Sequence, residues 1–351
     1  MQNPFSTTFS KIPEHSYIST AQTDEIMENF NYELPSESVY KITGVRGSGK
    51  TVLLAKLEQE FESETWSREG WIVCRLNPAR EMLVQMLAIL CKEGLSKTTH
   101  GIDLNVSANV FGIGGGIGVS ESGNRIEDIG VELDAALKNA MDKKKKIFIG
   151  IDEISRTREM EIFALEFGGW LRAGYPVYLV CTGLYENIEQ LYNVKNLTFF
   201  RRATTVKTEH LNLVRMSEMY RKKLGTDITM ARKLAEMTKG YAYAFQVLGI
   251  LCFKAGTGFD LEEVTADLKT ELYAYSYEKI WEELTDNDRK MVRLISDRYE
   301  YGREEILSVM EKPGNYPVYR DRLSRRGIID TKRGRIGLAL PFFGEYVNTY
   351  C

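Results

Sequence analysis

The sequence predicts an α/β fold in which a parallel sheet with flanking helices precedes a helical region and a small C-terminal module. Three observations predict it. Residues 38–54 read as a short β-prone run, a glycine turn and an amphipathic helix. Apolar runs at 147–151 and 177–181 are typical of buried strands. From His210 onward the apolar residues recur at helical spacing.

Length and composition narrow the class of protein. At 351 residues the chain exceeds the usual size of one core, so two or three domains are expected. It has 43% hydrophobic and 27% charged residues and a formal net charge of -3, which excludes a disordered or globally basic chain. Without a bilayer-length apolar run or a signal pattern, we expect a cytoplasmic protein with no membrane partner. The five scattered cysteines predict reduced core thiols.

The glycine turn at residues 44–51 reads GVRGSGKT and fits the phosphate-loop (Walker A) pattern G-x-x-x-x-G-K-[ST] at every fixed position. Glycines let successive backbone N–H groups surround an anion, and the helix start adds unpaired donors. Lys50 is predicted to reach the β- and γ-phosphates, and the Thr51 hydroxyl to ligate Mg2+. The alternative is an ordinary glycine-rich turn, which the flanking strand and helix disfavour. The predicted nucleotide-binding residues are Gly44, Val45, Arg46, Gly47, Ser48, Gly49, Lys50, Thr51 and Val52.

A second strand at 70–76 and a helix at 81–93 follow the phosphate-loop helix. Residues 101–120 then alternate apolar and polar side chains and are rich in glycine, which predicts a hairpin inserted in the domain. A hairpin that contacts a partner and a plain edge hairpin are both open interpretations.

The strand at 147–151 ends in Asp152 and Glu153, in the manner of a Walker B motif. A carboxylate at the C-terminal end of a parallel strand beside a phosphate loop can hold Mg2+ through water, which predicts that role for Asp152. Glu153 would orient and deprotonate the attacking water. Apolar runs ending in Asp-Glu also occur as solvated strand ends, so the pair is informative only together with the loop upstream.

Two further segments carry candidate catalytic residues. The strand at 177–183 ends in Thr182, whose hydroxyl could sense the γ-phosphate or the attacking water, although Thr-Gly is also plain turn chemistry. Residues 197–206 carry Arg201 and Arg202 before a last strand, and one arginine could stabilise phosphate charge in cis. We favour Arg202; the alternative is a surface pair.

The C-terminal part reads as helices over 210–284 and then as three helices and a hairpin, which describe a winged helix. The third helix and the hairpin form a basic patch in a chain of net negative charge, which suits the phosphates along a duplex. Winged-helix modules also serve as protein contacts, so both uses stay open. The residues predicted to contact DNA are Arg320, Arg322, Arg325, Arg326, Lys332, Arg333 and Arg335.

Taken together, the segments GVRGSGKT, IFIGIDE, LVCTG, FFRRATT, GYAYAFQVLG and RLSRRGIID...GLALPFFGEYV resemble prokaryotic ATPases of the STAND and archaeal-ATPase group, related to initiator-type AAA+ proteins. The similarity covers nearly the whole chain. It implies an additional-strand (ASCE) P-loop fold with sheet order 5-1-4-3-2, a helical lid and a C-terminal winged helix. It also implies ATP as the nucleotide, since no Asn-Lys-x-Asp guanine motif appears.

The resemblance assigns roles to the matching positions. It implies that Lys50 and Thr51 bind phosphate and Mg2+, that Asp152 is the Mg2+ carboxylate, and that Glu153 is the catalytic base. Thr182 would be the sensor and Arg202 the arginine before the fifth strand. The sequence departs from the pattern of this group at two places. Ala242 stands where the lid turn often has proline, and the Gly-Arg often seen before the first helix is absent, with residues 18–20 near where it would fall. The resemblance therefore assigns no adenine-contacting residues.

The sequence therefore predicts a P-loop ATPase domain over 1–209, a helical lid over 210–284 and a winged helix over 285–351. The leading interpretation is a slow ATP-hydrolysing molecular switch whose nucleotide state the winged helix relays to DNA or a protein partner. One alternative is a DNA-binding regulator or initiator that uses ATP mainly as a ligand. The other is a non-hydrolysing interaction scaffold. A nucleotide-dependent homo-oligomer is a further partner state that the resemblance suggests.

Overall fold

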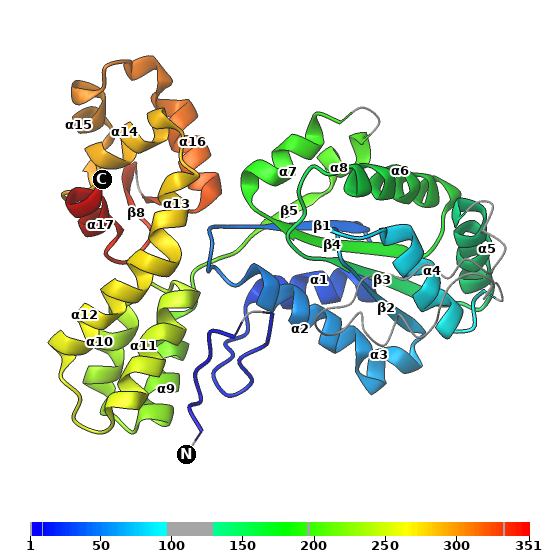
Figure 1. Cartoon of the computed structure of the whole chain (residues 1–351), viewed down its shortest axis with the longest axis horizontal. Coiled ribbons are helices and arrows are strands. Elements are labelled where there is room, and N and C mark those ends of the chain that lie inside the picture. The colour runs from blue at the N-terminus through cyan, green and yellow to red at the C-terminus, as the bar shows by residue number, and fades with distance from the viewer. Residues whose placement is uncertain (1, 9, 97–128, 195–196, 333) are drawn as a thin grey trace, which may run out of the picture. The chain divides into compact units, whose positions relative to one another are not determined.

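The computed structural model describes residues 2–8, 10–96, 129–194, 197–332 and 334–351 (Figure 1). The chain forms two compact units. One, here called the lid unit, comprises Met1–Asp24, Thr43–Leu53 and Lys207–Cys351; the other, the sheet unit, comprises Glu25–Ile42 and Leu54–Val206. The phosphate loop thus belongs to the same unit as the helical region and the winged helix. The hairpin expected at 101–120 lies outside the described residues, and the three-domain division stays a prediction.

The sheet has five strands in the order β2-β3-β4-β1-β5, which is the predicted order. β2 pairs with β3, and β3 with β4, in parallel register, with Ile151 opposite Leu76 and Cys181. The carboxyl ends of β3 and β4 therefore lie at the same edge of the sheet. The strands are β1 (Val39–Thr43), β2 (Trp71–Leu76), β3 (Lys146–Ile151), β4 (Val177–Gly183) and β5 (Thr204–Lys207).

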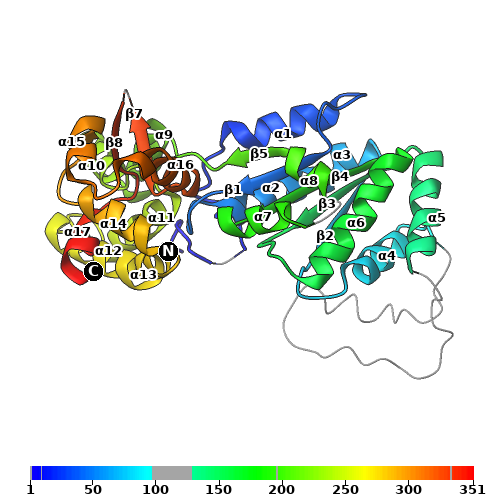
Figure 2. The ribbon, with the colours of Figure 1, turned by 90° about the horizontal axis from the view of Figure 1, so that it is seen from above.

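Both faces of the sheet are covered by helices, because successive side chains of a strand point to opposite sides and both sets are apolar here. On one face, aromatic rings in contact join the strands to α1, α2 and α3, among them Phe30, Phe61 and Phe148. On the other face, aliphatic side chains pack against α4 to α8. Figure 2 shows α1 and α6 on opposite sides of the strands. The helices are α1 (Ala21–Asn31), α2 (Lys50–Glu62), α3 (Glu64–Arg68), α4 (Met82–Lys92), α5 (Ile129–Asp142), α6 (Arg158–Ala173), α7 (Tyr185–Tyr192) and α8 (Thr198–Arg202).

The helical region of the lid unit forms where the sequence predicts it. Side chains of Asn212, Asp227 and Asp260 accept hydrogen bonds from the first free amides of α9, α10 and α12, which fixes where these helices begin. The N-terminal segment packs on this region, with Phe5 against the rings of Tyr220 and Phe245. The elements are α9 (Leu213–Leu224), α10 (Ile228–Met237), α11 (Ala242–Ala255), α12 (Leu261–Leu272), the π-helix η2 (Tyr273–Tyr277) and α13 (Glu278–Glu282).

The remaining elements follow the helix and strand order of a winged helix, so the predicted fold class is confirmed. Their antiparallel sheet has the order β6-β8-β7. The two-residue β6 and the terminal α17 were not predicted, the first because it is too short to show a period. The elements are α14 (Asp286–Leu294), β6 (Tyr301–Gly302), α15 (Arg303–Val309), the 3-10 helix η3 (Pro313–Asn315), α16 (Tyr316–Arg326), β7 (Ile329–Lys332), β8 (Arg335–Leu338) and α17 (Phe343–Tyr350).

Over the described residues, no helix combines the length and the apolar composition that crossing a bilayer requires.

Candidate nucleotide-binding site

The phosphate loop follows β1 directly and leads into α2, which begins at Lys50. Gly47 has a φ of 71°, in the left-handed region that glycine adopts at little cost. A Cβ at Gly47 would lie 2.4 Å from the Tyr241 hydroxyl oxygen, and one at Gly44 would lie 2.0 Å from Thr208 Oγ1. Close neighbours therefore require glycine at both positions, and at Gly47 the turn requires it as well.

The Lys50 side chain curls back over the loop. Its Nζ donates hydrogen bonds to the carbonyl oxygens of Gly44 and Val45, both at 3.0 Å. The ammonium, the loop amides and the first turn of α2 together form the set of donors that a phosphate chain needs. The residues present thus fit a nucleoside triphosphate, and Thr51 is the second residue of the helix, where the pattern puts the Mg2+ ligand.

The start of α11 lies against the loop. The Tyr241 hydroxyl donates to the carbonyl of Arg46 at 2.6 Å and is 2.8 Å from Ser276 Oγ, a residue of the π-helix η2. The amide of Tyr243 donates to the carbonyl of Gly47 at 3.0 Å. Burial raises the pKa of Tyr241, so its hydroxyl remains a donor. The 240–243 turn thus holds two carbonyls of the phosphate loop.

In the sheet unit, the candidate carboxylates follow β3. The Thr182 hydroxyl is buried, donates to the Asp152 carboxylate and accepts a hydrogen bond from the amide of Glu153 at 3.0 Å. Glu153 has a φ of 53°, an uncommon conformation for a residue with a side chain that often marks functional sites. Its side chain is exposed. Asp152 is therefore oriented by its neighbour, while Glu153 projects from a constrained backbone.

A second carboxylate near Asp152 was missed in the sequence. Glu58 on α2 accepts a hydrogen bond from Arg75 of β2 at 2.8 Å, and burial raises its pKa to about 7. It lies over Gly150 of β3, where a Cβ would be 2.2 Å from its Oε1. The signal that could have found it is a glutamate beside the apolar stripe of α2 matched by an arginine within an apolar strand.

Lys41, in the middle of β1, was missed as well. It is fully buried, and its Nζ donates to the Phe200 carbonyl at 2.7 Å and to the Tyr192 hydroxyl at 3.0 Å. It thus ties β1 to the end of α8, which carries Arg201 and Arg202. Both arginines are exposed, and within the described ranges neither makes an ion pair. The signal was a lysine inside an otherwise apolar strand.

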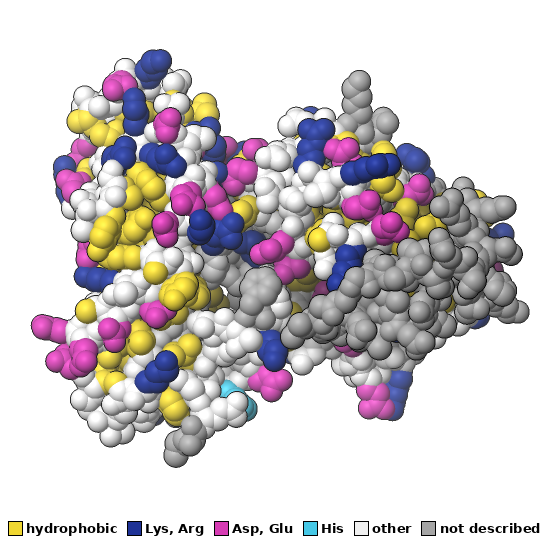
Figure 3. Space-filling view, in the orientation of Figure 1, with side chains coloured by type: hydrophobic (Ala, Val, Ile, Leu, Met, Phe, Trp, Pro, Cys, Tyr) yellow, Lys and Arg dark blue, Asp and Glu magenta, His cyan; other side chains and the backbone are white. Residues whose placement is uncertain are grey.

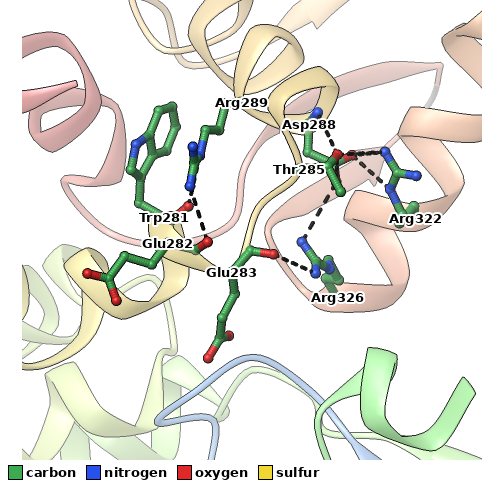
Figure 4. Close-up of polar contacts among 8 residues, drawn as sticks. All are labelled: Trp281, Glu282, Glu283, Thr285, Asp288, Arg289, Arg322 and Arg326. Atoms are coloured by element: carbon green, nitrogen blue, oxygen red, sulfur yellow. Dashed lines mark hydrogen bonds and ion pairs between the residues drawn. The ribbon is translucent and has the colours of Figure 1, made fainter. Parts of the chain in front are cut away.

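Six of the seven predicted DNA-contacting residues lie within the described ranges, and they fall into two groups. Arg322 and Arg326 face inward, toward the fully buried carboxylate of Asp288 (Figure 4). Arg320, Arg325, Lys332 and Arg335 are exposed, with Arg325 paired to Asp321 and Arg335 to Glu300. Arg333 lies outside the described residues. On the face seen in Figure 3, basic and acidic side chains are interspersed over the winged helix.

Comparison with known proteins gives a clear likeness of structure only. No protein-family model matches the chain, and no curated protein matches its sequence. A Walker-type ATPase of Pyrococcus abyssi matches with a TM-score of 0.62 and 14% identity, over 95% of this chain and 97% of that one. The ORC2 protein of Aeropyrum pernix, in ADPNP-ADP complexes, matches with a TM-score of 0.55 and 14% identity, over 93% and 92%. Its ADP form gives 0.52 and 13%, over 98% and 96%.

The fold and the loop together define an additional-strand P-loop protein, because β4 lies between the strand that enters the phosphate loop and the strand that ends before Asp152. More narrowly, its fold is that of the archaeal Walker-type ATPases and of ORC proteins. The resemblance inferred from the sequence is confirmed at the level of fold.

Proposed function

We propose that this protein is an ATP-binding switch that hydrolyses ATP slowly and relays its nucleotide state to the winged helix. One observation carries the proposal: the phosphate loop is contacted both by the lid and by the winged helix. Tyr241 and Tyr243 hold its carbonyls. Gly327, at the end of α16, lies against Val45, so that a Cβ at this glycine would be 3.5 Å from the Val45 amide nitrogen. A loop that rearranges around phosphate must change these contacts.

The chemistry follows from the side chains in hand. Lys50 would leave the Gly44 and Val45 carbonyls and pair with phosphate oxygens. Thr51 and Asp152 would hold Mg2+, which neutralises charge on the phosphates. Glu153 would take the proton of the attacking water, and Arg202 would stabilise the charge that develops in the transition state. The nucleotide complexes of the ORC2 protein support ATP and ADP as ligands.

The test uses two variants. Lys50→Ala should abolish ATP binding, because the remaining loop lacks the cation that pairs with the phosphates. Glu153→Gln should bind ATP but lose turnover, because the amide cannot accept the water proton. Calorimetric titration and phosphate release measure the two effects. ATP turnover at the wild-type rate in Glu153→Gln would show that the base lies elsewhere.

We propose that the nucleotide state is relayed to double-stranded DNA, which α16 and the hairpin of β7 and β8 would contact. The exposed side chains of Arg320 and Lys332 favour it, since they are available to phosphates. A protein partner is the second candidate, and duplex binding with and without ATP and Mg2+ separates the two. The solution mass, measured with and without ATP and Mg2+, reports whether nucleotide changes the oligomeric state.

A further inference from the structure

We propose that Arg46 passes the state of the phosphate loop to α16 through an ion pair with Glu283. The inference rests on the switch proposed above and names the route by which the relay would run. Arg46 occupies a position where the phosphate-loop pattern accepts any residue, so the pattern itself gives it no role.

Both the side chain and the backbone carbonyl of Arg46 make contacts with other residues of the lid unit. Its Nε donates to Glu283 Oε1 at 2.6 Å, and the same oxygen is 2.6 Å from Nη2. Its carbonyl accepts the Tyr241 hydroxyl. A shift of the loop backbone at this residue therefore moves the guanidinium and its partner together, or breaks the pair.

Glu283 connects this pair to the winged helix. It follows the last residue of α13, and its carbonyl accepts a hydrogen bond from Arg326 Nη2 at 2.9 Å (Figure 4). Arg326 also faces the buried Asp288, which accepts hydrogen bonds from Arg322. A continuous set of polar contacts thus runs from the phosphate loop through the end of α13 to α14 and α16.

Nucleotide binding acts on the loop end of this set. Lys50 must release the carbonyls of Gly44 and Val45 to reach phosphate, and these are the two residues before Arg46. The ion pair is partly exposed, with 43% of the Arg46 side chain and 30% of the Glu283 side chain accessible. Pairs of this kind are weak, so we expect it to set a coupling of about two- to five-fold rather than an all-or-none lock.

The neighbouring Glu282 provides a matched control. Its carbonyl, like that of Glu283, accepts a hydrogen bond from an arginine, in this case Arg289 of α14 at 3.1 Å. Its carboxylate, however, pairs with Lys279 of α13. Glu282→Gln and Glu283→Gln therefore remove the same charge at adjacent positions. Only Glu283→Gln removes a link to the phosphate loop.

The experiment is hydrogen exchange of the full chain with and without ATP and Mg2+, read at the amides of α16. We expect ATP to change the exchange of α16 in the wild type and in Glu282→Gln. In Glu283→Gln this ATP-induced change should shrink about two- to five-fold while ATP still binds.

A full wild-type response in Glu283→Gln would overturn the route and leave the switch standing. An absence of any response of α16 in ATP-bound wild type would overturn both the route and the switch. Exchange of α16 without nucleotide, compared between the two glutamine variants, shows whether Glu283→Gln has merely loosened the winged helix, a result that would also overturn the route.

Discussion

The Thr182 hydroxyl donates a hydrogen bond to the Asp152 carboxylate. A hydroxyl has a single proton to donate, so in this structure Thr182 orients Asp152 and does not donate to a phosphate. One of the lone pairs of its oxygen accepts a hydrogen bond from the Glu153 amide at 3.0 Å. The role of Thr182 as a sensor of the γ-phosphate stays a prediction, and the contacts give it a positioning role that needs no bound nucleotide.

The first prediction concerns this hydroxyl. Thr182→Val keeps the side-chain shape but leaves the Asp152 carboxylate and the Glu153 amide short of a partner, which costs about 1–3 kcal/mol. We expect ATP turnover to fall about ten- to a hundred-fold if that energy is lost at the site. Thr182→Ser should keep most of the activity. Steady-state phosphate release at several Mg2+ concentrations measures it, and equal rates in the wild type and Thr182→Val would contradict the positioning role.

Glu58 predicts a pH dependence of stability. Burial, opposed by Arg75, raises its pKa from 4.5 to about 7, with smaller contributions from Glu62 and Asp152. The folded state therefore binds the proton more tightly than the unfolded chain. The contribution is fully present below pH 4.5 and is lost as the pH rises through 7, by at most about 3 kcal/mol.

Urea unfolding at pH 5 and pH 8 measures this effect. Glu58→Gln should remove that part of the difference between the two pH values, because the amide does not titrate. Glu60→Gln is the control, since Glu60 lies on the same helix in an ion pair with Lys56. If Glu58→Gln keeps the pH dependence of the wild type, Glu58 is not the group that titrates.

The buried hydrogen bonds of Lys41 predict that its ammonium group contributes to the stability of the fold. Lys41→Met fits an apolar site but leaves the Phe200 carbonyl and the Tyr192 hydroxyl without their donor, at a cost of about 1–3 kcal/mol in the free energy of unfolding. Lys138→Met, at an exposed position of α5, should change it by less than about 0.5 kcal/mol. Urea unfolding compares the two, and equal stabilities would show that the buried ammonium contributes nothing net.

Which features could be predicted from the sequence depends on whether the interactions that form them are local in the chain. The phosphate loop and its helix were predicted because a contiguous pattern specifies them, and the sheet order came from a resemblance over the whole chain. The pairing of Arg46 with Glu283 joins residues 237 positions apart, and that of Lys41 with Phe200 joins residues 159 apart. No period or motif encodes such pairs. The basic patch was counted by charge, which cannot show that Arg322 and Arg326 face a buried carboxylate.

The buried position of Asp288 predicts that replacing it causes a large loss of stability in the winged helix. Its side chain is fully buried and accepts hydrogen bonds from Arg322 and Thr285. Asp288→Ala leaves Arg322 and Arg326 facing an apolar side chain, and losing one partner of a buried ion pair costs about 3–5 kcal/mol. Asp286→Ala, at a side chain that is 93% exposed, is the control. Thermal unfolding and exchange of α16 measure the difference, and equal midpoints for the two variants would contradict it.

The two groups of basic residues make the DNA proposal testable. Arg320 and Lys332 are exposed, so replacing either with alanine should weaken duplex binding and lower the slope of log affinity against log salt by about 1 for each phosphate that is no longer neutralised. Arg325 and Arg335 should matter less, because acidic neighbours already neutralise them. Arg232→Ala, on the exposed side of α10, is the control for net charge. Fluorescence anisotropy over a salt series measures the slope. Duplex affinity that is insensitive to both Arg320→Ala and Lys332→Ala would overturn the DNA proposal and favour a protein partner, because cations that bind a duplex cannot be removed without weakening it.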